Sequence, residues 1–399
     1  MSLSPFKVMC AAGLFAIFSS TLSKSPVLPL FAVHLGATAP EVGIIAAVST
    51  LAGIAFSIPA GILSDRFGRK TMLIAAGVVF ASAPAMYLFT SGIWPLAAIR
   101  FYHGLATAIF MPVAMAYVSD LHEESKGEKL GWFSTATLLG RFMAPLTGGA
   151  LLGYLGSDSS LGFAAIYSLC FVAGALALGV SAKMPSATGS PHALKTWKHQ
   201  TEGLIHLLSS GPLLSIGMVE AAVLFVYGTI EVFLPLYGLS QGIGAFQVGI
   251  CLAAQVVTLA ATKPVMGRLS DRHGRSGQIV WGALLGVAAA ASMAAPASFV
   301  LLFALSILIG LSLSIVTSAT SAAVADISRC ENRGSAMGVF GTIMDVGHSA
   351  GPLVAGVVVA FWGFKAAFIG CAIILALAVV SFRAITTNQM SPCSIREQG

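Results

Sequence analysis

Seven ionisable side chains stand inside long apolar stretches of this 399-residue chain. An ionised group at the centre of a membrane costs roughly 2.5–3.5 kcal/mol on insertion scales, so a residue of this kind is by default a candidate for function. The seven are the acids Glu220, Glu231 and Asp345 and the bases Lys24, Arg100, Arg141 and Lys263. Their chemistry would be proton exchange on the carboxyl groups, modulated by nearby positive charge.

Glu220 and Glu231 are eleven residues apart, about three helical turns, so they lie on nearly the same helix face together with Tyr227. Such a stripe is unfavourable against lipid, and we expect it to face a central cavity or the opposite half of the molecule. Burial favours the neutral form of a carboxyl group, which suits a proton carrier. The pair is therefore predicted to carry protons. A permanent structural ion pair with a basic residue is the alternative.

Asp345 and His348 are one helical turn apart and could form a second titrating unit, because histidine changes its charge near neutral pH. The alternative for His348 is a hydrogen-bonded packing role.

Lys24 could bind a substrate or counter-ion, or form a fixed salt bridge, in a segment that is unusually rich in serine. Lys263 lies close to a predicted cytoplasmic loop, and its long side chain is expected to reach toward the water there.

The composition indicates which solvent surrounds these residues. Hydrophobic residues make up 57% of the chain and charged residues only 9%, against about 25% in ordinary soluble domains. This excludes a soluble globule and predicts a chain embedded in the lipid bilayer. Because a crossing needs about 20 apolar residues, there is room for roughly a dozen crossings and for no large extramembrane domain.

Several other classes lack their signatures. The basic residues are scattered through short loops, so we expect no nucleic-acid partner. The six cysteines show no metal-binding spacing, and no phosphate-binding loop is present. No nucleophile–base pattern was found either, and the chain is predicted to be no enzyme and to use no cofactor or metal.

Twelve apolar segments are predicted to be membrane-spanning helices, which gives an all-α integral membrane fold. They cover residues 8–34, 42–63, 71–90, 95–118, 130–154, 162–181, 212–238, 247–267, 278–297, 299–325, 335–360 and 365–383. With the N-terminus inside, sixteen Lys and Arg fall in cytoplasmic segments and only Lys365 on the other side. Both termini are therefore predicted to be cytoplasmic.

An internal repeat organises these helices. The segment GILSDRFGRK at 61–70 recurs as GRLSDRHGRS at 267–276, an offset of 206, which becomes 207 after one insertion. Two six-helix halves of the same orientation, 1–181 and 212–399, would be related by an axis along the membrane normal and would hold a site between them. Residues 182–211 are interpreted as a cytoplasmic linker with a short amphipathic piece near Trp197–Leu208.

The repeated loop resembles the G-x-L-a-D-r-x-G-r-k motif of the major facilitator superfamily of secondary transporters, and the resemblance covers the whole chain. In that motif, Asp65 could cap a helix, and Arg69 could reach Asp120 to form a clamp that gates alternating access. Generic solvation of a loop is the alternative. The expected gating residues are Gly61, Asp65, Arg66, Gly68, Arg69 and Asp120, and in the repeat Gly267, Asp271, Arg272, Gly274, Arg275 and Asp326.

A second motif resembles the antiporter motif of the family's fifth helix, with Ala144 in place of a usual glycine. Small residues allow close helix packing in lipid, and Pro145 can bend the helix. The motif could therefore serve packing alone or take a direct part in coupling. Its residues are Gly131, Gly140, Pro145, Gly148 and Gly149, with Gly351 and Pro352 in the repeat.

Arg100, with Gly104 one turn later, resembles the intramembrane arginine of the family's fourth helix, and its fixed charge would modulate a neighbouring carboxyl proton. Arg141 and His348 occupy equivalent positions in the two halves, so this position is basic in both. Residues that share the predicted substrate cavity are Lys24, Arg141, Tyr227 and His103. Proton coupling is assigned to Glu231, Glu220, Asp345, His348 and Arg100.

The resemblance implies a proton-coupled efflux antiporter of a drug or metabolite, working as a monomer in the cell inner membrane. Its expected partners are a small-molecule substrate, protons and the lipid bilayer. One alternative is a transporter or facilitator of an anionic metabolite, because four buried bases exceed three buried acids. The other is a non-transporting scaffold or receptor on the same fold.

Overall fold

A computed structural model describes residues 4–121, 125–185, 211–295, 298–327 and 333–389. These residues are helical apart from short turns and caps, which confirms the predicted all-α fold. The helices are α1 (Pro5–Leu22), α2 (Val27–His34), α3 (Ala39–Phe67), α4 (Arg69–Tyr87), α5 (Ile93–Leu121), α6 (Lys126–Leu155), α7 (Ser160–Ala182), α9 (Gly211–Ser240), α10 (Ala245–His273), α11 (Arg275–Ser292), α12 (Phe299–Ile327) and α13 (Arg333–Gln389).

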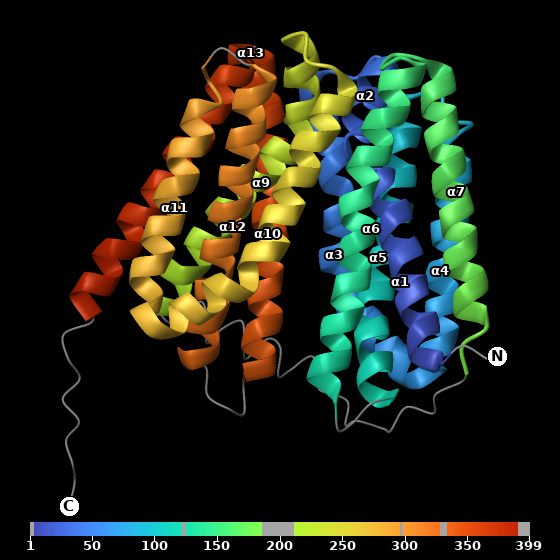
Figure 1. The fold of residues 1–399 in the computed structure, drawn as a ribbon, viewed down its shortest axis with the longest axis horizontal. Coiled ribbons are helices and arrows are strands. Elements are labelled where there is room, and N and C mark those ends of the chain that lie inside the picture. Colours follow the sequence, from blue (N-terminus) through green and yellow to red (C-terminus); the bar gives the residue numbers. More distant parts are fainter. Residues whose placement is uncertain (1–3, 122–124, 186–210, 296–297, 328–332, 390–399) are drawn as a thin grey trace, which may run out of the picture.

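The helices form two bundles that stand side by side, α1–α7 and α9–α13 (Figure 1). Helix α1 begins and helix α13 ends at the same end of the molecule, called the terminus end below; the other is the distal end. The amphipathic piece predicted near Trp197–Leu208 and most of the linker lie outside the described residues. The boundaries of the two halves and the linker remain predictions.

Within the described residues, nine helices are long and apolar enough to cross a membrane, with α1 and α2 counted as one span. The prediction of twelve crossings adds the more polar α6 and α11 and counts α13 twice. Helix α13 is in fact two helices joined at Gly363, where the backbone takes φ 80° and ψ 174°. Glycine has no Cβ to clash at positive φ, so the chain can turn there.

Local sequence signals explain where the helices meet. The capping box at Thr38 begins α3, with the Glu41 carboxylate accepting a hydrogen bond from the Thr38 backbone N–H at 2.7 Å. Gly68 separates α3 from α4 with φ 88°, and its repeat partner Gly274 separates α10 from α11 with φ 88°. The two copies of the loop motif are therefore the same structural turn.

Glycines bring the same helix pairs together in both bundles. A Cβ on Gly104 of α5 would lie 2.6 Å from the Ser49 carbonyl oxygen of α3. A Cβ on Gly310 of α12 would lie 2.6 Å from the Gln255 carbonyl oxygen of α10, at positions one repeat further along the chain. Backbones that approach this closely exclude any larger side chain, so the repeat fixes the packing of each half.

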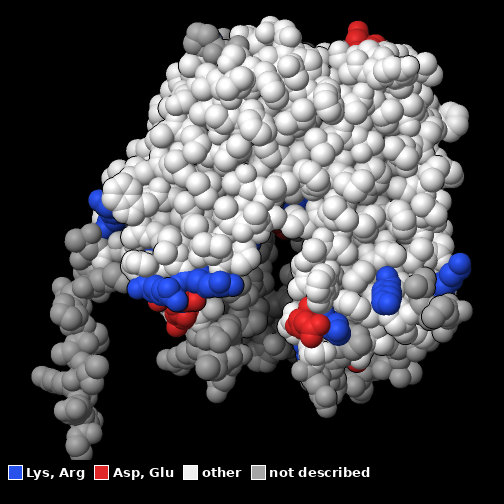
Figure 2. Space-filling model, in the orientation of Figure 1, with Lys and Arg blue, Asp and Glu red and all other residues white. Residues whose placement is uncertain are grey.

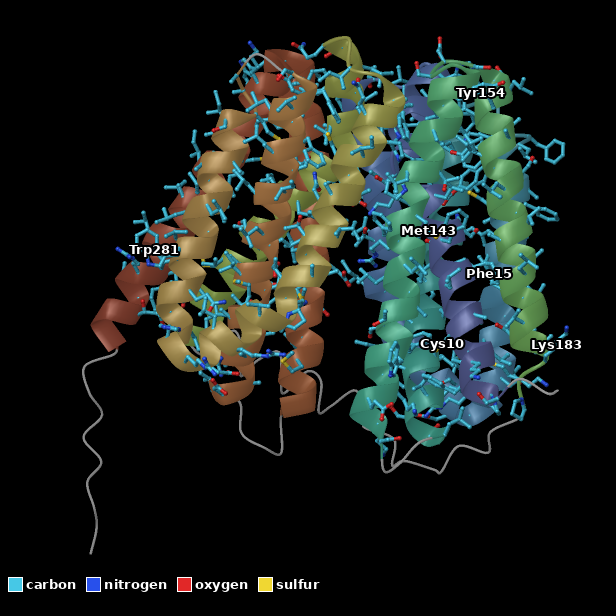
Figure 3. All side chains as sticks on the ribbon, in the orientation of Figure 1. Cys10, Phe15, Met143, Tyr154, Lys183 and Trp281 are labelled. Atoms are coloured by element: carbon cyan, nitrogen blue, oxygen red, sulfur yellow. The ribbon has the colours of Figure 1, made fainter. Side chains whose placement is uncertain are left out.

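The outer surface is apolar over most of its height. Large side chains such as Met143, Tyr154 and Trp281 are exposed on the outside of the bundles (Figure 3). Most of the charged side chains visible on the molecular surface lie toward the terminus end (Figure 2). An apolar band with charges toward one end is the surface expected of a bilayer-embedded protein.

The two bundles touch each other at the distal end. One hydrophobic cluster there includes residues from both, among them Leu28 and Ile45 of the first bundle and Phe233 and Ala355 of the second. Toward the terminus end the surface is hollowed between the bundles (Figure 2). The molecule is thus closed distally and open at the terminus end.

Candidate functional site

A cavity of about 420 Å³ lies between the two bundles. Its lining side chains come from α1 and the turn that follows it, α3, α5 and α6 of the first bundle, and from α9, α10, α12 and α13 of the second. These two sets are equivalent under the repeat, so each half contributes the same four helices. The cavity is therefore where a site between two homologous halves is expected.

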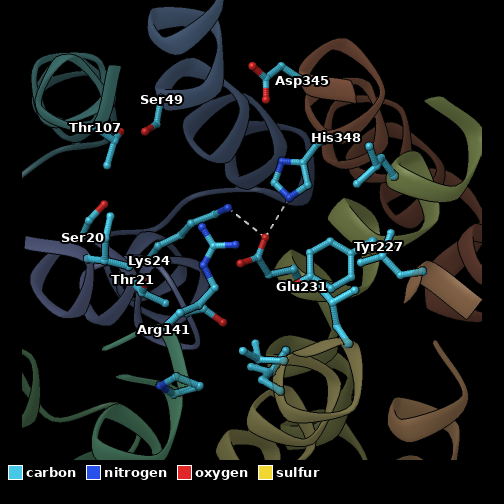
Figure 4. A pocket seen from close by; sticks show the side chains of 18 of the residues that line it. Ser20, Thr21, Lys24, Ser49, Thr107, Arg141, Tyr227, Glu231, Asp345 and His348 are labelled. Atoms are coloured by element: carbon cyan, nitrogen blue, oxygen red, sulfur yellow. Dashed lines mark hydrogen bonds and ion pairs between the residues drawn. The ribbon is translucent and has the colours of Figure 1, made fainter. Parts of the chain in front are cut away.

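Glu231 of α9 is the centre of the polar cluster in this cavity (Figure 4). Its Oε2 accepts a hydrogen bond from Lys24 Nζ at 2.8 Å and lies 3.0 Å from His348 Nε2. Lys24 belongs to the first bundle, whereas Glu231 and His348 belong to the second. A single carboxylate oxygen therefore forms an ion pair that bridges the two halves.

Three more of the predicted residues line the same cavity. The ring of Tyr227 lies 5.8 Å from the ring of His348, and Arg141 and Asp345 also contribute to the wall. Within the described part of the chain, neither Arg141 nor Asp345 forms an ion pair. In the described part of the wall, the carboxylate of Glu231 is thus in an ion pair, whereas the carboxylate of Asp345 and the guanidinium of Arg141 are not.

Glu220 does not line the cavity, so the expectation that it shares this surface with Glu231 is wrong. Its side chain is fully buried inside the second bundle, where Thr320 of α12 lies 2.6 Å away. The spacing correctly predicts one helix face, but a face eleven residues long extends about 16 Å. Helix α12 covers α9 at Glu220, while the cavity begins further along.

His103 also lies outside the cavity, contrary to the prediction. It is buried in the first bundle, with Nδ1 3.4 Å from both the Ser23 hydroxyl and the Tyr87 hydroxyl. Three residues after Arg100 on α5, it points toward α4 and packs edge-on against Phe80. Its neighbours make it part of a buried polar network.

Arg100 belongs to the cavity wall although it is only 2% exposed. Its guanidinium lies 3.3 Å from the Tyr87 hydroxyl and 3.5 Å from the Ser23 hydroxyl. Among the described residues it has no carboxylate partner, and its Nε has no hydrogen-bond partner. Arg100 is therefore a buried positive charge held by neutral oxygen atoms.

Lys263 lines the cavity from α10, a placement that sequence reasoning missed. Its side chain is exposed, and no ion pair of Lys263 occurs in the described residues. The hydroxyl residues Ser49, Thr107 and Thr317 were missed as well. For Lys263 and for these three hydroxyl residues, the sequence signal that was available is a polar residue within an apolar helix. Four Lys and Arg side chains consequently face two carboxylates around the cavity.

The loop motif forms an ion cluster at the terminus end of the first bundle. Arg69 Nε lies 3.2 Å from Asp120 Oδ2, and an Arg69 terminal nitrogen lies 2.5 Å from Asp65 Oδ1 and donates to the Ser64 hydroxyl. The predicted contact between Arg69 and Asp120 is confirmed. Asp65 was expected to cap a helix, and it pairs with Arg69 instead because the two are one turn apart across Gly68.

The repeat makes the same cluster in the second bundle, where Arg275 Nε lies 3.1 Å from Asp326 Oδ2 and a terminal nitrogen lies 2.5 Å from Asp271 Oδ1. Arg275 is more exposed than Arg69. Each cluster joins three helices of a single bundle, and neither crosses between the bundles.

The antiporter motif packs against the opposite bundle at the distal end. A Cβ on Gly149 of α6 would lie 2.7 Å from the Ala245 carbonyl oxygen of α10, and a Cβ on Gly249 of α10 would overlap the Pro145 carbonyl oxygen. The close packing predicted for this motif is therefore present, and it joins the two halves.

An equivalent contact joins α3 and α13. A Cβ on Gly356 would lie 2.6 Å from the Ala39 carbonyl oxygen, and a Cβ on Gly43 would overlap the Pro352 carbonyl oxygen. The other motif glycines pack inside one bundle or are open: Gly140 against α1, Gly148 against Leu22 and Val27, Gly351 against α9, and Gly131 with no atom within 4 Å of a built Cβ.

Comparisons with known proteins agree with this architecture. The family model of the Major Facilitator Superfamily matches residues 9–254 and 216–392. The chain is 26% identical over 375 residues to the multidrug resistance protein MdtG of Escherichia fergusonii, covering 89% of this chain and 88% of that protein. It is 31% identical over 172 residues to the multi-drug resistance efflux pump PmrA of Streptococcus pneumoniae, covering 40% and 43%.

Solved structures share the fold at low sequence identity. A bacterial homologue of the human lysosomal transporter Spinster, in an inward-facing and unoccupied conformation, aligns with a TM-score of 0.80 at 14% identity, over 97% of this chain and 98% of that one. The nucleoside transporter NupG aligns with a TM-score of 0.81 at 14% identity, over 96% and 99%. With two repeated bundles around one cavity and a family match over nearly its whole length, the chain belongs to the Major Facilitator Superfamily.

Proposed function

We propose that this secondary transporter exports a small organic molecule in exchange for protons, as a monomer and without enzymatic activity. The observation that carries the proposal is Glu231, whose carboxylate oxygen contacts Lys24 across the cavity and His348 beside it. The modest similarity to multidrug efflux proteins supports export as the direction of transport.

Protonation of Glu231 would couple the proton to a change of conformation. A neutral Glu231 carboxyl group loses most of its attraction for the Lys24 ammonium group, so the ion pair between the halves weakens. Lys24 is then free to interact with a substrate or with water. His348 Nε2 lies 3.0 Å from the same oxygen and would remain beside Glu231 when the contact with Lys24 is lost.

The distribution of Lys and Arg supports an orientation with the terminus end in the cytoplasm. In that orientation the cavity is open to the cytoplasm, and the glycine and proline contacts of α6 with α10 and of α3 with α13 close the outside. Opening outward would separate these contacts. The Arg69 and Arg275 clusters would keep the cytoplasmic ends of their own bundles rigid during that motion.

Transport into proteoliposomes tests the coupling, with ethidium as a cationic probe and a pH gradient as the driving force. Glu231→Gln should abolish ethidium accumulation that depends on the gradient. Glu128→Gln, which changes an exposed carboxylate at the terminus end, is the matched control and should retain it. Gradient-driven accumulation by Glu231→Gln equal to that of the unmodified chain would refute the assignment.

Transport of an anionic metabolite, by import or facilitated exchange, is a second candidate, because four Lys and Arg face two carboxylates in the cavity. Arg141 and Lys263 have no ion pair among the described residues and could bind a carboxylate or phosphate group. Competition between carboxyfluorescein, an anion, and ethidium separates the candidates. Stronger uptake of carboxyfluorescein, reduced at least tenfold by Arg141→Gln, would favour the anionic substrate.

A further inference from the structure

Glu220 is a fully buried acid that the cavity does not use. One of its oxygen atoms, Oε2, lies 2.6 Å from the Thr320 hydroxyl, and the other, Oε1, has no hydrogen-bond partner. The same Thr320 hydroxyl lies 2.8 Å from the Val316 carbonyl oxygen. The Glu220 carboxyl group of α9 thus meets the Thr320 hydroxyl and the Val316 carbonyl of α12 inside the second bundle.

The hydrogen-bond chemistry of this contact determines where the protons are. A threonine hydroxyl has one proton to donate, and a backbone carbonyl oxygen can only accept. If Thr320 donates to Val316, its oxygen must accept from Glu220, which is possible only when the carboxyl group is protonated. An ionised Glu220 would also leave a charged oxygen buried without a partner, a costly arrangement.

The charged groups around Glu220 are few. Of the helices packed against α9, α13 contributes Ile343 and Gly347 near the neighbouring turns, while its Asp345 lines the cavity. On α12, Asp326 pairs with Arg275 of α11. Lys263 of α10 is the nearby cation among the described residues: the Ser318 hydroxyl, two residues before Thr320 on α12, donates to the Lys263 backbone carbonyl oxygen at 3.4 Å.

We propose that Glu220 is a neutral carboxylic acid in this conformation and a second proton site whose own side chain lies outside the cavity, with the cavity-lining Lys263 as its counter-ion once the proton has left. The role of Glu220 in transport rests on the proposed proton exchange, whereas its protonation state does not. The released proton passes to water, and the negative charge left on Glu220 is balanced by the Lys263 ammonium group.

Infrared spectroscopy of the full-length protein in lipid tests the protonation state directly. The carbonyl-stretch band of a buried carboxylic acid should be present at neutral pH, absent in Glu220→Gln and retained in Glu231→Gln. Thr320→Val should move the band, since the acid loses its acceptor, and Thr320→Ser should restore its position. These two variants keep the test open if Glu220→Gln does not fold.

Lys263→Met tests the counter-ion. Without the positive charge the carboxylate is less stable, so the acid band should persist to higher pH than in the unmodified chain. A wild-type spectrum whose acid bands are unchanged in Glu220→Gln and Thr320→Val would overturn the proposal, as would a band insensitive to Lys263→Met.

Transport measurements separate this inference from the proposed function. Ethidium accumulation driven by a pH gradient should fall at least tenfold in Glu220→Gln. A band from Glu220 together with undiminished coupling in Glu220→Gln would overturn its role as a second proton site and leave the Glu231 mechanism standing. If Glu231→Gln loses the coupling and Glu220→Gln keeps it, the role of Glu220 as a second proton site is likewise overturned.

Discussion

At the scale of single residues, Glu231 forms an ion pair between the two halves through one oxygen atom. Its side chain is 12% exposed and that of Lys24 is 23% exposed, so the pair is shielded from bulk water but remains accessible from the cavity. Salt screens such a pair less than it screens a pair on the surface. Loss of one partner leaves the other charged in a largely apolar environment.

Lys24→Met should lower the free energy of unfolding by about 1–3 kcal/mol, because Glu231 loses the ammonium group at 2.8 Å. The double variant Lys24→Met/Glu231→Gln should recover much of this loss, since neither charge remains. Thermal unfolding in detergent of both single variants and the double variant measures the coupling energy. Strictly additive effects would show that the contact does not stabilise the protein.

Arg69 and Arg275 form equivalent clusters with unequal burial. Arg69→Gln should cost about 2–4 kcal/mol, because Arg69 is 7% exposed and contacts three side chains. Arg275→Gln should cost at most about 1 kcal/mol, since its ion pairs are more exposed. Denaturation of the two variants in parallel gives the comparison, and a larger loss for Arg275→Gln would contradict it.

At the scale of helices, glycine determines which pairs can touch between the bundles. Helix α3 meets α13 at Gly43, and α10 meets α6 at Gly249, through backbone carbonyl oxygens rather than side chains. Contacts of this kind separate without breaking a strong hydrogen bond or an ion pair. They suit a closure that must open again in each transport cycle.

Gly43→Ala should favour the conformation that is open at the distal end, because the new methyl group would overlap the Pro352 carbonyl oxygen. Gly53→Ala on the same helix is the control, since a Cβ at Gly53 would have no atom within 4 Å. Spin labels at the exposed distal positions Tyr154 and Trp362 would report the separation of the bundles. Equal distance distributions in both variants would argue against a steric role for Gly43.

At the scale of the whole molecule, orientation in the membrane decides the meaning of the open end. Lys183 lies at the terminus end and Tyr154 at the distal end (Figure 3). In intact cells, a membrane-impermeant maleimide should label Tyr154→Cys, whereas Lys183→Cys should react only after permeabilisation. The opposite pattern would reverse the assigned orientation and turn the cavity toward the outside.

Much of this architecture follows from sequence, because it depends on periodicity and repetition. The repeat places Arg275 and Asp326 at the positions equivalent to Arg69 and Asp120, and the structure contains the same contact in both halves. The positions of Glu220, His103 and Lys263 were not predictable in the same way. Helical spacing fixes the face on which a residue lies, but the neighbouring helix that covers this face depends on tilt and packing.

The ion pair between Lys24 and Glu231 has no copy in the repeat. At the offset of 206, Ile230 stands in place of Lys24 and Ser25 in place of Glu231, although the glycine contacts of both halves match. An axis along the membrane normal exchanges the two halves and leaves the two sides of the membrane distinct, so identical halves would place every cavity residue twice around that axis. The unmatched charges break that equivalence, so the cavity has one ion pair between the halves where a symmetric molecule would have two.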